Sequence, residues 1–354
     1  MRRLLFFRSV PLFLLCLMLA CGGSRTVTLN SMRPAEITLP ASVKTLLIVD
    51  RSVHKSKPVN VVESILTGEL PGEDKSGIQE FLSGLNQQLG YSSRYTVKTA
   101  EEKLPGNSLT SAFPDALSWD QVEELGEKYQ ADAIVALEMF DTDFIITKGN
   151  KNVTEKVGDN EVRVLKYYAQ GVGNITIGIR LYDIGNRTIV DQQKISDTHA
   201  WEAAGNSIQE ALLQLTSKRD ATLYLGNSVG KDYAYKVAPM PVRISRSFRG
   251  KSKKSPELEQ GSRYADVAQW ENAINAWKSG LDRARDKEAG YLAYNIAIGY
   301  EVLGDFDTAL NWAKTSYTRY GNKDARAYVS LIKNRLRAER LANRQLELGY
   351  QPEE

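Results

Sequence analysis

Cys21 is the residue whose surroundings indicate the most specific chemistry in this sequence. An apolar residue, Met18, stands three positions before it, a small residue, Ala20, stands directly before it, and two glycines follow. Small residues let a peptidase approach the backbone, and the thiol of the cysteine can carry a diacylglycerol. Cys16, the other cysteine of the chain, lies upstream and would be removed. The pattern therefore predicts cleavage before Cys21 and lipidation of its thiol.

The residues before Cys21 have the composition of an export signal. Three arginines lie within the first eight residues, and an apolar stretch of about a dozen residues, 9–20, follows them. This stretch is too short to span the roughly 30 Å of a bilayer core as a helix. We predict a signal peptide over residues 1–20 and a short lipidated tether over residues 21–41.

The segment around Cys21 resembles a lipobox, the cleavage and lipidation motif of bacterial lipoproteins, with Met18 where leucine is usual. The residues after Cys21 include no aspartate of the kind that retains lipoproteins at the inner membrane of some bacteria. They also lack the acidic cluster associated with surface export. The resemblance therefore implies a lipid anchor in the outer membrane, on its periplasmic face.

The mature chain would be neutral and would keep a single thiol. The full sequence has 46 Lys and Arg against 43 Asp and Glu, and the leader removes three arginines and no acids. An equal balance of charge gives no argument for nucleic-acid binding. With the lipid on Cys21, no cysteine is left for a disulfide or a thiolate metal site. The remaining ~330 residues are enough for two globular domains.

Residues 42–240 are predicted to form a domain of the α+β or α/β class with a mixed sheet. The apolar run within residues 42–50 is typical of a buried strand. Apolar residues spaced by 3, 1, 3 and 4 predict a helix that ends at Gly90. Ser118, with Gln121 three residues later, indicates an N-cap and a capping box for the next helix.

The second half of this domain has the clearest strand pattern. Residues 132–139 begin a long strand, and apolar side chains in residues 175–181 alternate with polar ones. Residues 183–187 predict a turn, after which residues 188–198 return antiparallel. Two further helices would close the domain.

Residues 258–348 contain an internal repeat. Tyr264 recurs as Tyr300, Ala273 recurs as Ala309, and two further pairs keep the same spacing of 36 residues. A repeat of this length indicates stacked helical hairpins, and a last helix would cap the stack. We therefore predict an all-α helical-repeat domain.

Both domains resemble known families. Residues 43–50, 129–137 and 179–191 look like the α/β domain of envelope lipoproteins related to curli-secretion proteins and the amino-terminal domain of the Tol-system propeller protein. Proteins of that class assemble with other envelope proteins and are not enzymes. The repeat is similar to the tetratricopeptide repeat, with Gly261 and Tyr264 on its first helix, but it lacks the closing proline and has two units where about three are usual. The whole chain is similar to an uncharacterised family of Bacteroidetes lipoproteins with this domain order.

A run of basic residues between the two domains is a candidate contact for an anionic partner. Residues 241–257 are predicted to be a linker, and no acidic residue lies between positions 243 and 254. The basic residues are Arg243, Arg246, Arg249, Lys251, Lys253 and Lys254. Such a run can contact anionic lipid headgroups or an acidic protein, and a solvated linker is the alternative that charge runs usually favour.

Aromatic residues of the repeat region are candidates for a partner groove. Helical repeats often bind a peptide or a helix in a concave groove. Trp277, Tyr294 and Trp312 are the residues expected to line it. The alternative for each of them is packing in the core, because they stand at helical spacings.

No catalytic or metal-binding pattern stands out in the sequence. The two histidines, His54 and His199, form no His-Glu-x-x-His motif. Residues 226–231 match a phosphate loop poorly, since their glycines are too close together and Asp232 stands where Ser or Thr would bind magnesium. We therefore expect no cofactor and no metal.

Together these patterns predict a non-enzymatic, lipid-anchored envelope protein. It would bind one or more envelope proteins as a scaffold or assembly factor, attached to the membrane through its lipid. Two alternatives stay open. One is a subunit of an oligomeric secretion or envelope complex that uses the strand region 135–199, and the other is an enzyme or accessory protein acting on periplasmic polymers. The oligomeric state also stays open.

Overall fold

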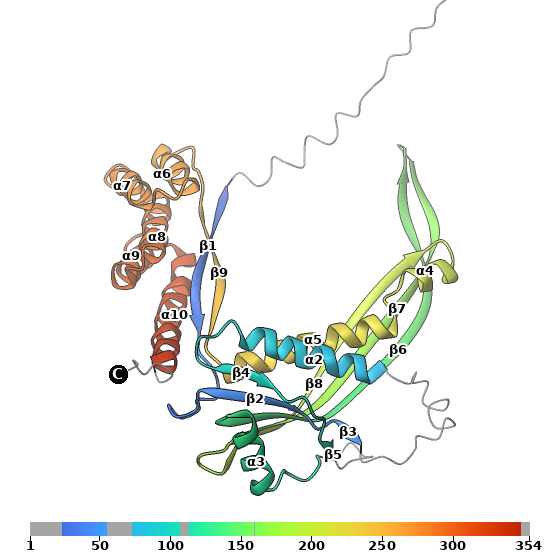
Figure 1. Ribbon diagram of the computed structural model, residues 1–354. Coiled ribbons are helices and arrows are strands. Elements are labelled where there is room, and N and C mark those ends of the chain that lie inside the picture. Colours follow the sequence, from blue (N-terminus) through green and yellow to red (C-terminus); the bar gives the residue numbers. More distant parts are fainter. Residues whose placement is uncertain (1–22, 55–72, 107–112, 159, 348–354) are drawn as a thin grey trace, which may run out of the picture. The chain divides into compact units, whose positions relative to one another are not determined.

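A computed structural model describes residues 23–54, 73–106, 113–158 and 160–347 (Figure 1). The predicted lipidation site, Cys21, lies outside these described residues. The chain is α+β, with a sheet-rich amino-terminal region followed by a region of several helices. It divides into two compact units, which are described one at a time. The sheet unit comprises the described residues of 33–241 and 341–354, and the helical unit comprises those of 1–32 and 242–340.

The sheet unit is built on a five-stranded mixed sheet in the order β4-β2-β6-β7-β8. Its strands are β2 (Thr45–Asp50), β4 (Thr96–Thr99), β6 (Ala133–Val157), β7 (Asn160–Asp183) and β8 (Thr188–Gly205). β2 runs parallel to β4 and β6, whereas β7 runs antiparallel to β6 and β8. A short parallel pair, β3 (Val53–His54) with β5 (Pro105–Gly106), lies outside this sheet. The strand expected within residues 42–50 is confirmed as β2, and the antiparallel return after residue 187 is also confirmed.

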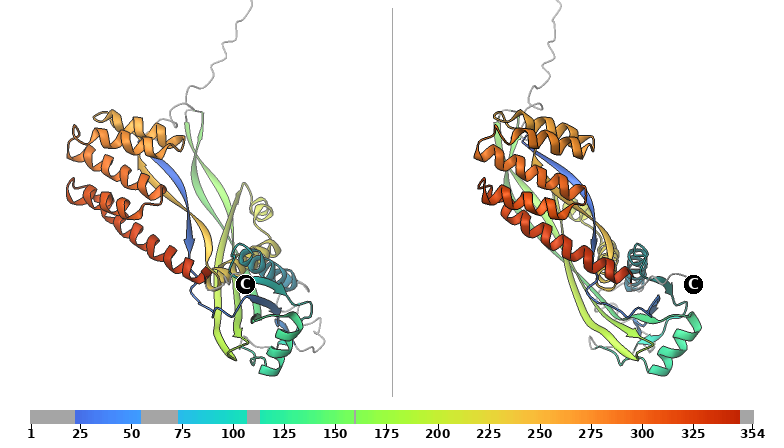
Figure 2. Two further views of the ribbon diagram at one scale, coloured as in Figure 1. Left: turned by 60° about the vertical axis from the view of Figure 1, so that its left-hand side comes forward. Right: turned by 90° about the vertical axis from the view of Figure 1, so that its left-hand side faces the viewer.

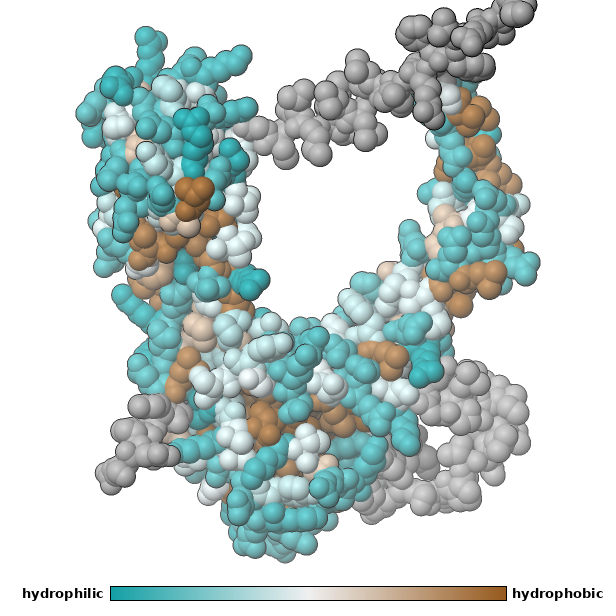
Figure 3. Space-filling view, turned by 45° about the horizontal axis from the view of Figure 1, so that its top comes forward, coloured by the Kyte–Doolittle hydropathy of each residue, from teal (hydrophilic) through white to brown (hydrophobic). Residues whose placement is uncertain are grey.

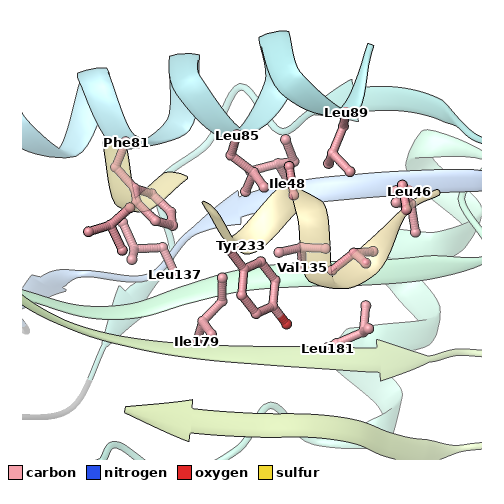
Figure 4. Close-up of a cluster of buried hydrophobic side chains, with 14 of the residues drawn as sticks. Leu46, Ile48, Phe81, Leu85, Leu89, Val135, Leu137, Ile179, Leu181 and Tyr233 are labelled. Atoms are coloured by element: carbon pink, nitrogen blue, oxygen red, sulfur yellow. The ribbon is translucent and has the colours of Figure 1, made fainter. Parts of the chain in front are cut away.

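Helices cover both faces of the sheet where it is widest. α2 (Glu73–Leu89) and α5 (Lys218–Val237) pack on one face, against side chains that alternate along β2, β6 and β7. Figure 4 shows Phe81 and Leu85 of α2 and Tyr233 of α5 pointing at this layer. α3 (Trp119–Tyr129) packs on the other face. Period-two alternation thus divides β2 between two cores, with Leu46 and Ile48 in the first and Leu47 and Val49 in the second.

The start of α3 is set by the capping box expected from the sequence. The Ser118 hydroxyl accepts a hydrogen bond from the Gln121 backbone N–H at 3.3 Å, and the Gln121 side chain accepts one from the Ser118 backbone N–H at 3.2 Å. These bonds satisfy backbone donors that the first turn of a helix leaves without partners.

Glycines allow α2 and α5 to approach each other closely. Gly226 and Gly230 lie inside α5, and a Cβ added at Gly226 would come within 2.5 Å of the Gly77 carbonyl oxygen of α2. A Cβ at Gly84 would likewise come within 2.5 Å of the Asn227 carbonyl oxygen. The segment 226–231 is therefore helix interior packed against a helix, and its glycines serve this packing.

β6 and β7 extend well beyond the helices as a hairpin. β8 pairs with β7 only as far as Tyr167, so residues 151–157 and 160–166 pair only with each other among the described residues. A short helix, α4 (Ile208–Gln214), packs on β7 and β8 near the end of β8. We call the self-paired segment the outer ribbon.

The helical unit contains five helices among its described residues. They are α6 (Pro256–Asp266), α7 (Trp270–Gly280), α8 (Asp286–Val302), α9 (Phe306–Thr318) and α10 (Lys323–Glu347, to residue 340 in this unit). Consecutive helices from α6 to α9 pack in order against one another, as expected for helical hairpins. Figure 2 shows these helices, from orange to red, stacked beside two strands.

Those two strands differ from the expectation of a tether and a linker. β1 (Ser24–Arg33) lies within the predicted tether, and β9 (Met240–Arg249) occupies much of the predicted basic linker. The two strands pair with each other in a two-stranded sheet, and the Gly250 N–H donates to the Gly23 carbonyl at 3.1 Å. Along β9 the exposed Arg243, Ser245 and Ser247 alternate with residues that are buried or half-buried, namely Val242, Ile244, Arg246 and Phe248, and this alternation lets the strand bury one side. Phe248 is buried between Trp270 and Trp277, with ring centroids 6.1 and 5.8 Å away.

Replacing Gly226 by Ala should destabilise the sheet unit. Alanine favours a helix interior over glycine by about 1 kcal/mol, but here its Cβ would overlap a backbone oxygen of α2 that cannot rotate away. We expect the free energy of unfolding to fall by about 2 kcal/mol, as for other overpacked cores, measured by urea denaturation followed by circular dichroism. Gly149→Ala is the control, since nothing lies within 4 Å of a Cβ there. Equal effects of the two substitutions would contradict the packing argument.

Candidate interaction surfaces

A groove beside Trp312 opens on the surface of the helical unit. It has a volume of about 610 Å³ and lies between α9 and the connection from α7 to α8. Its lining residues are Leu281, Asp282, Ala284, Asn311, Trp312, Thr315, Arg319 and Tyr320. Trp312 is half-buried, so one part of the indole packs in the unit and the rest faces the groove. Apolar and aromatic surface with charges of both signs at the rim suits one large side chain of a peptide, together with its polar neighbours.

Trp277 lies in the core and lines no groove. Its side chain is fully buried, and its indole N–H donates to the Leu258 carbonyl at 3.3 Å. The indole lies directly against Gly261, where a Cβ would overlap it. The expectation that Trp277 lines a partner groove is therefore wrong, and core packing, the alternative, describes it.

Tyr294 and Arg249, expected at two different sites, meet at one smaller pocket of about 360 Å³. The Arg249 guanidinium carbon lies 4.4 Å from the centroid of the Tyr291 ring. The Tyr294 ring packs on Tyr328 with the centroids 5.0 Å apart, and burial raises the pKa of its hydroxyl. Asn295 binds both the N–H and the carbonyl of Arg249, so the end of β9 is fixed against α8.

Arg246 is committed to a buried ion cluster. Its guanidinium donates to both carboxylate oxygens of Glu301, each at 2.9 Å. Arg335 donates to the same carboxylate at 2.9 Å, and the Tyr328 hydroxyl donates to it at 2.5 Å. Glu301 is 1% exposed. The cluster therefore joins β9, α8 and α10, and Arg246 is not free to bind an external anion.

The cluster controls the ionisation of its members. Burial alone would raise the pKa of Glu301, but the hydrogen bonds from Arg246, Tyr328 and Arg335 outweigh it and hold the pKa below its ordinary value of 4.5. Burial, followed by the charge of Glu301, raises the pKa of Tyr328 far above its usual range. Glu301 is thus a carboxylate at neutral pH, and Tyr328 remains a hydrogen-bond donor.

The remaining basic candidates are exposed. Arg243 lies on β9, and Lys251, Lys253 and Lys254 follow the end of that strand. Among the described residues, none of these three lysines takes part in an ion pair. They are therefore the members of the basic run that can meet an anionic surface.

A second buried ion cluster, in the sheet unit, was not predicted from the sequence. Glu138 of β6 is 2% exposed and pairs with Arg51 and Arg180, and it also accepts a hydrogen bond from the Tyr182 hydroxyl at 3.1 Å. Arg180 also donates to the Pro114 carbonyl at 2.7 Å, which fixes the loop that covers the cluster. The sequence did contain a sign of this cluster, because the charged residues Glu138 and Arg180 each interrupt an apolar strand pattern. Glu138 thus joins β6 to β7 and to the segment after β2 through these internal bonds.

The histidines and acidic residues form no metal site within the described ranges. His199 packs between Trp201 and Tyr224, with ring centroids 4.6 and 4.9 Å away. The side chain of His54 lies outside the described residues. Over the part of the chain that the structure describes, no group of three His, Cys, Asp or Glu could hold a metal ion. In that same part, no helix is long and apolar enough to cross a membrane.

The outer ribbon carries exposed apolar side chains. Those near or within it are Ile145, Ile146, Val157, Val162 and Leu165, with exposed fractions between 43 and 61%. Figure 3 shows apolar residues on the surface of this hairpin. Lysines and glutamates lie among them, and Lys166 pairs with Glu155 at 3.2 Å. The ribbon therefore offers a mixed surface and unpaired strand edges.

Two family models match the chain. The model described as "Domain of unknown function (DUF8603)" matches residues 43–248, and the model described as "Domain of unknown function (DUF6340)" matches residues 259–338. A search of the curated proteins finds no match.

Solved structures show only weak similarity. The PelC dodecamer from Paraburkholderia phytofirmans is 10% identical and covers 60% of this chain and 98% of its own, with a TM-score of 0.23. A neuraminyllactose-binding hemagglutinin homolog from Helicobacter pylori is 13% identical and covers 57% and 87%, with a TM-score of 0.25. The hypothetical protein CT253 from Chlamydia trachomatis is 11% identical and covers 44% and 71%, with a TM-score of 0.18. At these TM-scores the similarities carry no argument.

Replacing Glu301 by Gln should destabilise the helical unit at neutral pH. Arg246 and Arg335 would lose their counter-charge while buried, and we expect the free energy of unfolding to fall by about 3–5 kcal/mol. Because the pKa of Glu301 is lowered, its contribution is complete above the unfolded value of 4.5 and is lost as the pH falls through the lower folded value. Urea denaturation from pH 7 to pH 3 should therefore show that the difference in the free energy of unfolding between wild type and variant becomes smaller as the pH falls.

Glu259→Gln is the matched control. Glu259 forms an exposed pair with Arg263 at 3.6 Å, which should contribute less than about 1 kcal/mol. If the two substitutions had equal effects at pH 7, the cluster would not have the stabilising role assigned to it.

Proposed function

Because the DUF8603 model matches more than half of its residues, the chain belongs to that family, and we propose that it is a lipid-anchored envelope protein that binds a protein partner. It would act without catalysis, as a scaffold or assembly factor at the periplasmic face of the outer membrane. The observation that carries partner binding is the groove beside Trp312. The observation that carries the anchor is the sequence around Cys21.

The helical unit supports the proposal that its helices are tetratricopeptide-like units. α6 with α7 and α8 with α9 are two helical hairpins that follow the 36-residue recurrence of the sequence. Ala273 and Ala309, which stand at corresponding positions of that recurrence, are both fully buried. Small residues at these positions let neighbouring helices approach closely. In this proposal α10 caps the stack, which would otherwise end on an exposed apolar helix face.

The occupant we propose for the groove is a segment of a partner protein with one large apolar side chain. Such a side chain would pack on the exposed part of Trp312 and on Leu281. Asn311 and Asp282 at the rim can accept hydrogen bonds from the segment's backbone, and Arg319 can pair with an acidic neighbour. A few residues, enriched in Trp, Tyr and Arg, carry most of the binding energy in many protein interfaces.

Cys21→Ala should remove the protein from the membrane. Without the thiol no diacylglycerol can be attached, so we expect loss of metabolic palmitate label and recovery of the protein in the soluble fraction. Cys16→Ala is the matched control, because Cys16 belongs to the leader, and this variant should keep label and membrane association. Label retained by Cys21→Ala would contradict the proposed anchor.

A photo-crosslinking residue at Thr315, in the groove, should capture a defined partner in the intact envelope. The same residue at Lys333, on the exposed side of α10, should not capture that protein. Trp312→Phe keeps most of the packing in the unit but reduces the indole surface, and truncation at such a contact commonly costs more than about 1 kcal/mol. We therefore expect the Thr315 product to fall several-fold in Trp312→Phe at equal protein level. The same product at both positions, or a yield that Trp312→Phe leaves unchanged, would contradict the proposed groove.

A further inference from the structure

We propose that Lys251, Lys253 and Lys254 bind the anionic phospholipid headgroups of the leaflet that holds the lipid of Cys21. The three lysines, called here the anchor-side lysines, follow the end of β9. The inference rests on the proposed lipid anchor and adds a surface that orients the helical unit on the membrane. Its support comes from chain geometry, from exposure and from the pairing of nearby charges.

The start of β1 fixes the anchor close to these lysines. One residue separates Cys21 from Gly23, so their Cα atoms lie at most about 7 Å apart. Gly23 in turn accepts a hydrogen bond from the Gly250 N–H at 3.1 Å. Lys251 is the next residue, and its Cα atom lies about 3.8 Å from that of Gly250. A lipid on Cys21 therefore brings the bilayer surface to the end of β9.

A turn keeps the other two lysines at this end of the β1–β9 strand pair. The Lys254 N–H donates to the Ser252 hydroxyl at 3.3 Å, and the Ser255 N–H donates to the Ser252 carbonyl at 3.3 Å. α6 begins directly after the turn, at Pro256. The three lysines are thus confined to one short segment that starts at the anchored strand pair.

Two acidic residues of the adjacent helix α6 pair with arginines, so they leave the lysines available for anionic headgroups. Asp266 pairs with Arg25 at 3.3 Å, and Glu257 pairs with Arg283 at 2.6 Å. The side chains of the anchor-side lysines are exposed and take part in no ion pair among the described residues. At physiological ionic strength the field of an anionic bilayer extends about 8 Å from its surface. Long, flexible lysine side chains beside the anchor can reach that layer.

The alternative occupant of this surface is an acidic protein. The anchored bilayer is present at this position at all times, whereas a protein would have to compete with it. A basic segment beside that lipid would also add electrostatic attraction to the anionic headgroups around it. For these reasons we assign the lysines to the membrane.

The test uses the mature chain from residue 21 with Cys21→Ala, so that no lipid masks the contribution of the lysines. Its partitioning onto vesicles of phosphatidylethanolamine with 30% phosphatidylglycerol is compared with that onto phosphatidylcholine vesicles by flotation. Each lysine near such a surface should contribute about fivefold. Replacing all three by Gln should therefore lower the apparent partition coefficient by up to about 100-fold.

The matched control replaces Lys314, Lys323 and Lys333, three exposed lysines of α9 and α10, by Gln. This control loses the same number of positive charges as the variant of the anchor-side lysines, and we expect it to keep most of the binding to anionic vesicles. An equal loss in both triple variants, or no preference of the parent chain for anionic vesicles, would overturn the proposal. These outcomes are distinct from failure of the anchor, because palmitate labelling of Cys21 is measured separately.

Discussion

The burial of Glu301 is the constraint on which the arrangement of the helical unit depends. A carboxylate with almost no exposed surface must keep its counter-charges, because an unpaired charge in a core costs several kcal/mol. Arg246 of β9 and Arg335 of α10 supply those charges, so one carboxylate of α8 holds a strand and a second helix. The strand then stays on the helices and delivers Phe248 between two tryptophans. Phe248 thereby becomes part of the hydrophobic core of the helical unit.

The sheet unit uses the same interaction at a different place. Glu138 lies where β2 ends and β6 continues, and its two arginines come from the loop after β2 and from β7. In both units one buried glutamate is shared by two arginines and a tyrosine hydroxyl. Such clusters require every member to be in place, so they favour a single arrangement of strands and helices over its competitors. In each cluster the carboxylate is buried and is held by partners within its own unit.

Periodicity made much of the fold predictable. The strand at 45–50, the capping box at Ser118 and the helical C-terminal region follow from local patterns that need no knowledge of distant partners. β1 and β9 were missed because each is stabilised by a strand more than 200 residues away, and the basic residues of β9 concealed its alternation. Distant partners also explain why the roles of the candidate site residues could not be predicted. Arg246 looks like any other member of the run until Glu301 is brought beside it, and Trp277 differs from Trp312 only in what covers it.

The pairing of β1 with β9 changes what a lipid anchor would do. A tether of about twenty flexible residues would let the protein turn freely above the membrane, since the reach of a flexible chain grows with its length. Here one residue separates Cys21 from a strand pair whose far partner, β9, is locked to the helices through Arg246. A lipid on Cys21 would therefore restrain the helical unit itself, and the groove beside Trp312 would face a limited range of directions. Restricting orientation in this way raises the effective concentration of the groove for a partner held in the same membrane.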